Sequence, residues 1–161
     1  MRQALVLLAF LACSAVWGFR QRQFGRPMRL GALGAAKTTA VIIVDHGSRR
    51  AEANDMLLTT ALAYKRSSKV EIVEAAHMEM ASPSIADAYR RCVEQGAVHI
   101  ICHPFFLSPG RHVQEDIPAL MREASLQFPD VTYSITEPLG IQNGIVELIS
   151  QSIDRCLPPQ Q

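Results

Sequence analysis

Short runs of β-branched and apolar residues alternate with longer amphipathic runs from residue 40 onward, and few folds accommodate this alternation. The strand-like runs cover residues 40–45, 70–76, 98–102 and 131–135. The helix-like runs cover residues 51–66, 84–95, 113–128 and 143–156. Strands that alternate with helices form right-handed βαβ units, which place helices on both faces of a mainly parallel sheet. We therefore predict an α/β fold with three layers and a four-stranded sheet, whose strand order the pattern does not reveal.

Two features refine the expected core. The helical period over residues 51–66 predicts an inward face formed by Met56, Leu57, Ala61 and Leu62. Cys92 and Cys102 fall on a helix and a strand, where free cysteines usually act as small hydrophobes. No pair of cysteines has C-x-x-C spacing, so the sequence indicates neither a disulfide framework nor a zinc knuckle.

Residues 1–37 are typical of a targeting leader, which leaves residues 38–161 as the folded domain. Arg2 precedes an apolar run over residues 4–16 that is too short to span a bilayer, and an Arg-rich, acid-free stretch follows Phe19. A signal peptide followed by a transit-like segment resembles the bipartite leaders of plastid proteins. Plain secretion is the alternative, and neither interpretation leaves a membrane span in the mature chain.

The charge distribution argues against a nucleic-acid partner. Residues 1–37 carry six of the 16 basic residues and no acid, so the remainder has ten bases against 15 acids and a net charge of about −5. Phosphate binding needs a basic face, and the basic residues are concentrated in the leader.

Unusual polar residues follow the predicted strands, where ligands bind in open α/β sheets. His46 follows the first strand and precedes Gly47, which permits a sharp turn. An imidazole there can accept a proton or bind a divalent metal, although a single histidine in a turn is more often structural. Glu79 follows the second strand and either carries a proton or caps the next helix, whereas Glu115 and Asp116 would favour a helix dipole.

The loop after the third strand has the composition of a small-molecule pocket. Phe105, Phe106 and Leu107 offer an apolar wall for a flat macrocycle, or alternatively core packing beneath the loop. Gly110 and Arg111 suit close backbone approach and a ligand carboxylate, and His112 supplies a second imidazole. Two histidines without further strong ligands favour a transient metal site over a closed zinc site. Such a site fits metal insertion into a tetrapyrrole, where imidazoles present the ion and accept the departing pyrrole protons.

Four strings in this sequence, VIIVDHGSRR, EAAHMEMASPSI, PFFLSPGRHVQEDIP and ITEPLG, resemble the class II chelatases of the small CbiX and SirB type, closest to the plant sirohydrochlorin ferrochelatases. They occur in family order over residues 40–157. The resemblance implies a chelatase-like (flavodoxin-like) fold, a homodimer, plastid location and insertion of Fe²⁺ into sirohydrochlorin to give sirohaem.

By matching position, the resemblance assigns His46 and His112 as catalytic metal ligands, with His46 also the proton acceptor. It assigns Glu79 as a substrate contact, together with the substrate loop formed by Leu107, Ser108, Pro109, Gly110, Arg111 and His112. Plant relatives continue into a Cys-rich tail that binds an iron–sulfur cluster, and no such cluster is predicted for this sequence.

Three alternatives stay open. The same reaction with Co²⁺ would serve corrin (cobalamin) synthesis, because two imidazoles do not determine the metal. A non-catalytic metal or tetrapyrrole carrier would use the same histidines without turnover. A phosphate- or nucleotide-binding domain is disfavoured, because the first loop lacks both glycine-rich fingerprints.

Overall fold

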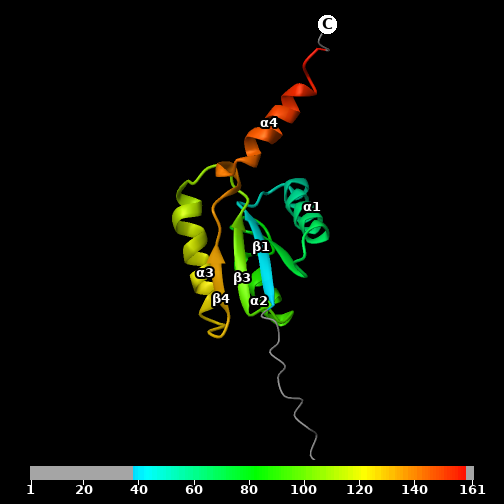
Figure 1. Ribbon diagram of the computed structural model, residues 1–161. Coiled ribbons are helices and arrows are strands. Elements are labelled where there is room, and N and C mark those ends of the chain that lie inside the picture. Colours follow the sequence, from blue (N-terminus) through cyan, green and yellow to red (C-terminus); the bar gives the residue numbers. More distant parts are fainter. Residues whose placement is uncertain (1–37, 159–161) are drawn as a thin grey trace, which may run out of the picture. The chain divides into compact units, whose positions relative to one another are not determined.

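The computed structural model describes residues 38–158, whose four strands form one sheet (Figure 1). The predicted leader, residues 1–37, lies outside this part of the chain. The strands are β1 (Thr39–Asp45), β2 (Ile72–His77), β3 (His99–Pro104) and β4 (Thr132–Ile135). Their pairings are parallel, in the order β2-β1-β3-β4. The predicted four-stranded α/β sheet is confirmed.

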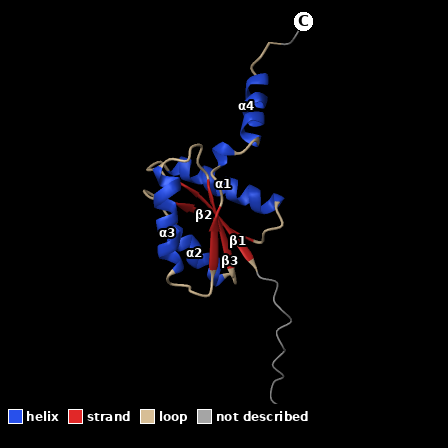
Figure 2. Cartoon of the chain, turned by 60° about the vertical axis from the view of Figure 1, so that its left-hand side comes forward, coloured by secondary structure: helices blue, strands red, loops and turns tan. Residues whose placement is uncertain are grey.

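Helices cover both faces of the sheet. The helices are α1 (Ala51–Ser67), α2 (Ile85–Glu94), α3 (Ile117–Ser125) and α4 (Gly144–Asp154), with a π-helical turn η1 (His112–Asp116) before α3 and a 3-10 turn η2 (Leu139–Ile141) before α4. Helices α1, α2 and α3 cover the sheet, whereas α4 extends away from it (Figure 1). Helices α2 and α3 lie side by side on one face, and α1 covers the other (Figure 2). Within residues 38–158, no helix combines the length and the apolar content that a bilayer crossing requires.

Strand β1 contributes to two hydrophobic clusters, because successive side chains of a strand point to opposite faces. Ala40, Ile42 and Val44 are buried in the larger cluster beneath α2 and α3. Val41 and Ile43 are buried in the smaller cluster beneath α1. The near-continuous apolar run predicted for this strand therefore reflects burial on both faces.

The two core cysteines are buried as predicted. Burial raises the pKa of the Cys92 and Cys102 thiols to about 12. Both therefore stay protonated near neutral pH and act as small apolar side chains.

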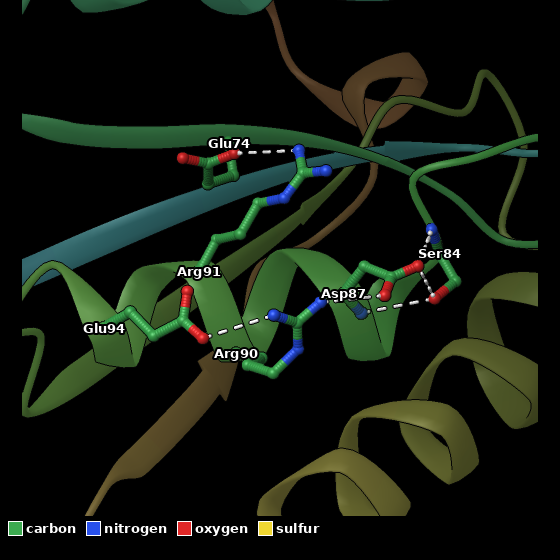
Figure 3. Close-up of polar contacts among 6 residues, drawn as sticks. All are labelled: Glu74, Ser84, Asp87, Arg90, Arg91 and Glu94. Carbon is green, nitrogen blue, oxygen red and sulfur yellow. Dashed lines mark hydrogen bonds and ion pairs between the residues drawn. The ribbon is translucent and has the colours of Figure 1, made fainter.

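Helix α2 begins with a capping box (Figure 3). The Ser84 hydroxyl accepts the Asp87 backbone N–H at 3.2 Å, and the Asp87 carboxylate accepts the Ser84 backbone N–H at 3.1 Å. The Ser84 hydroxyl also donates to the Asp87 carboxylate at 2.7 Å, and this bond, followed by the one from the Ser84 backbone N–H, holds the pKa of Asp87 below its usual value. Arg90 pairs with Asp87 and with Glu94 on the exposed side of the helix. The cap fixes where the chain re-enters a helix after the β2 loop.

Two of the four residues predicted to face inward on α1 are buried, and the prediction is wrong for the other two. Leu57 and Ala61 are buried, but Met56 is 61% exposed and Leu62 is 53% exposed. The described helices place no second helix against α1 on this face, so only the narrow stripe that contacts the sheet is covered.

Candidate active site

The carboxyl ends of β1, β2 and β3 form one rim of the sheet, because the three strands are parallel. Asp45 of β1 pairs with His77 of β2, and Val44 pairs with Pro104 of β3. His46 and Glu79, which follow β1 and β2, therefore lie on the same rim as the aromatic loop. The predicted convergence of these loops is confirmed.

Gly47 allows the β1 and β2 loops to approach each other. Its φ of +85° lies in the left-handed region, which disfavours other residues. A Cβ built at this position would overlap the Glu79 backbone carbonyl. The Glu79 N–H also donates to the His46 carbonyl at 3.1 Å, so the two loops are joined through their backbones.

His46 and Glu79 form a close side-chain pair. Nε2 of His46 lies 2.8 Å from Oε1 of Glu79, and Nδ1 of His46 lies 3.1 Å from the Gly47 carbonyl oxygen. A proton must lie between Nε2 and Oε1, because two unprotonated acceptors repel each other at this separation. The pair is therefore built to hold a proton at the rim. The side chains are 40% and 53% exposed, so that proton can exchange with solvent.

His112 comes to the same place from a distant part of the chain. Its ring centroid lies 5.1 Å from that of His46, with the two ring planes inclined by 65°. Nδ1 of His112 lies 2.7 Å from Oδ2 of Asp116, which leaves Nε2 as the nitrogen free to act as a ligand. A carboxylate behind a histidine commonly orients a metal-binding imidazole.

Asp116 was interpreted from sequence as a helix-dipole residue, and its contact with His112 was missed. The four-residue spacing carried the signal, since residues four apart lie on the same face of a helix. The predicted helix over residues 113–128 is also divided, because η1 has π-helical spacing up to Asp116. Pro118 explains the division: it has no N–H to donate to the Gln114 carbonyl and its ring would clash with that group.

A cavity of about 410 Å³ opens beside His46. Its walls come from the β1 loop, from α1 and from the loop after β3, with apolar lining by Ala53, Met56, Leu57, Phe105, Phe106 and Leu107. The exposure of Met56 is thereby explained, because this side chain borders the cavity instead of the core. An apolar wall beside convergent polar groups is typical of small-molecule sites.

The segment predicted to bind substrate runs along the outside of this rim. Residues 107–111 are exposed, and the Arg111 guanidinium lies 3.6 Å from the Asp116 carboxylate. Gly140 supports the start of this segment: its N–H donates to the Phe106 carbonyl at 3.0 Å, and a Cβ there would overlap the backbone of Leu107. The ITEPLG string thus holds the aromatic loop in place.

The remaining histidines lie on strands. His99 on β3 contacts the hydroxyl groups of Thr132 and Ser134 on β4, which indicates a structural role between these two strands. His103 borders a second apolar cavity on the α1 face, and burial lowers its pKa. His77 ends β2 and is buried. No group of three or more His, Cys, Asp or Glu side chains within residues 38–158 is arranged to hold a metal ion.

Comparison with known families identifies the chain. The family model CbiX matches residues 40–156, which include all of the rim described above. The chain belongs to the CbiX family. Within this family, the chloroplastic sirohydrochlorin ferrochelatase of Arabidopsis thaliana is 45% identical over 134 residues, covering 83% of this chain and 60% of that protein.

Other relatives of this CbiX chain differ in metal and in length. The sirohydrochlorin cobaltochelatase of Methanocaldococcus jannaschii is 32% identical, covering 73% of this chain and 96% of that protein. The structure of SirB from Bacillus subtilis with Fe³⁺ matches with a TM-score of 0.71 and 28% identity, covering 76% of this chain and 48% of SirB. The chain thus spans only part of the length of several relatives.

Proposed function

We propose that this protein is a sirohydrochlorin ferrochelatase that inserts Fe²⁺ into sirohydrochlorin to make sirohaem. The observation that carries the proposal is the meeting of His46, Glu79 and His112 on one rim, beside a cavity with an aromatic wall. The 45% identity to a protein named as a chloroplastic sirohydrochlorin ferrochelatase supports this substrate and a plastid location. A leader over residues 1–37 would direct it there.

The two histidines divide the work of insertion. His112, oriented by Asp116, presents Nε2 to the incoming ion, and His46 completes a two-imidazole site. An ion that binds Nε2 of His46 must displace the proton held against Glu79. Glu79 can carry that proton to solvent, because its side chain is about half exposed. The same route then removes the two pyrrole protons that leave the ring.

The substrate loop binds the ring of the pigment and its carboxylate side chains. Phe105, Phe106 and Leu107 offer a flat apolar surface on one side of the cavity, and Arg111 lies exposed beyond it. A guanidinium binds carboxylates through paired hydrogen bonds, so Arg111 would exchange its contact with Asp116 for a substrate carboxylate. Ser108, Pro109 and Gly110 join these two parts of the loop.

Replacing Gly140 by alanine should raise the KM for sirohydrochlorin by about tenfold, because the added Cβ displaces Leu107 and the loop it begins. Initial rates at varied pigment concentration measure this effect. Gly144→Ala is the matched control, since a Cβ there meets no atom within 4 Å. Equal KM values for the two variants would show that the loop position is unimportant.

The choice of metal can be tested directly. Purified protein is assayed anaerobically with sirohydrochlorin and either Fe²⁺ or Co²⁺, and kcat/KM is compared. We expect the value to be higher with Fe²⁺, in keeping with the ferrochelatase name of the 45% identical relative. A higher value with Co²⁺ would favour the cobaltochelatase alternative, which the 32% identical archaeal relative represents.

A homodimer completes the proposal. Helix α4 has no buried residue and exposes an apolar stripe made of Val146, Ile149 and Ile153, and the exposed Leu157 follows shortly after the helix. A cavity of about 400 Å³ on the α1 face of the sheet, lined in part by Ile43, Tyr64, Ile101 and Phe105, is equally apolar. We infer that a second copy covers these surfaces and takes the place of the additional length present in SirB.

Ile149→Glu should therefore weaken self-association by about 100-fold or more, because an unpaired carboxylate would be buried in the apolar contact. Light scattering coupled to size-exclusion chromatography measures the mass. Gln151→Glu adds the same charge about 200° around the helix and should leave the dimer intact. If Ile149→Glu kept the wild-type mass, α4 would not belong to the contact.

A further inference from the structure

A buried histidine behind the rim has no place in the chemistry described so far. The side chain of His77 is 1% exposed, and its Nδ1 lies 2.6 Å from Oδ1 of Asp45. Its Nε2 has no hydrogen-bond partner within the described residues. A carboxylate only accepts hydrogen bonds, so Nδ1 donates its proton to Asp45, and the buried Nε2 is left without a partner among the described residues. An apolar side chain would fill this space without leaving a polar atom unpaired.

The same carboxylate oxygen has a second partner in the turn that carries His46. Oδ1 of Asp45 accepts the Gly47 N–H at 2.9 Å, so it bonds to the residue on the far side of His46. Asp45 thus ties the His46 turn directly to His77 at the end of β2. Two backbone bonds continue the link: Met78 N–H to the Asp45 carbonyl at 2.8 Å, and Glu79 N–H to the His46 carbonyl at 3.1 Å.

The contact between His46 and Glu79 depends on this link. Both side chains are substantially exposed, and exposed ion pairs are held only weakly by their own attraction. Their 2.8 Å separation must therefore be imposed by the backbones beneath them, which Asp45 and His77 join. We propose that Asp45 and His77 form a positioning pair that holds Glu79 against His46 for metal insertion. The consequence for catalysis rests on the proposed function, whereas the structural link does not.

The kinetic test compares two substitutions of His77 in the full chain. His77→Leu removes the donor but keeps an apolar side chain, and kcat per folded protein should fall by about tenfold with little change in the KM for the pigment. His77→Asn should recover most of this loss, because its amide nitrogen occupies the position of Nδ1. His99→Leu is the matched control on another strand and should keep the wild-type kcat.

A substitution of Asp45 and a test in a His46→Ala variant distinguish a loss of positioning from misfolding. Asp45→Ala removes the acceptor from a side chain that is 24% exposed, and it should lower kcat like His77→Leu. In a His46→Ala background, His77→Leu should have almost no further effect, because the positioned residue is already absent. Wild-type kcat in both folded single variants, or an undiminished further loss in that background, would overturn the positioning role.

Nuclear magnetic resonance detects the contact between His46 and Glu79 independently of any activity measurement. In the wild-type background, Glu79→Gln should shift the ring resonances of His46, and in the His77→Leu background this shift should disappear. An unchanged shift would overturn the proposal. If wild-type protein inserted neither metal, the proposed function would fail, and the resonance comparison alone would support or overturn the positioning pair.

Discussion

Replacement of His46 by alanine should lower kcat for metal insertion by about 10²- to 10⁴-fold, the range expected when a general base is lost. The variant removes both the imidazole that meets the metal and the group that holds a proton against Glu79. Its melting temperature should stay close to that of the wild type, because the side chain lies on an exposed loop and its backbone bonds remain.

Anaerobic initial rates, followed by the absorption change of the pigment, measure this loss. His99→Ala is the matched control, since that histidine lies on β3 and bonds to residues of β4. Turnover by His46→Ala within a few-fold of the wild-type rate would remove His46 from the chemistry and leave it a structural turn residue.

Replacement of His112 by alanine should impair metal use far more than pigment binding. The ring supplies the nitrogen left free by the 2.7 Å bond to Asp116, so its loss should raise the KM for Fe²⁺ by about 100-fold. Asp116→Asn keeps the shape of the orienting group but not its charge, and it should cause a smaller change in the same direction.

The effect of His112→Ala on metal use is compared with its effect on pigment binding. Binding of sirohydrochlorin without metal, measured by fluorescence or absorption titration, should change little in His112→Ala. If pigment binding were lost while metal affinity stayed normal, the two-imidazole site would be wrong and His112 would belong to the substrate loop alone.

The elements could be predicted from sequence because their signals are local. Burial of β1 on both faces requires an apolar run, and the cap at Ser84 marks a helix start. The convergence of His46, Glu79 and the aromatic loop followed from the parallel sheet, since ligand loops of such sheets share one rim. The strand order did not follow, because it depends on pairings between distant segments.

The features that could not be predicted from sequence depend on which segments pack together in the fold. Met56 and Leu62 have the helical period of core residues, yet no other helix within residues 38–158 packs against α1, and both side chains stay exposed. The bond between His77 and Asp45 joins residues 32 positions apart, and no local pattern signals it. Asp116 was within reach of prediction, because its spacing from His112 is that of one helical turn.

Multiple turnover tests the catalytic claim most directly. Sirohydrochlorin and Fe²⁺ are supplied anaerobically in large molar excess over the protein, and the conversion of pigment is followed to completion. We predict that each subunit converts many equivalents at a constant initial rate. Conversion that stops at one equivalent per subunit would contradict an enzyme and identify the protein as a carrier of metal or pigment.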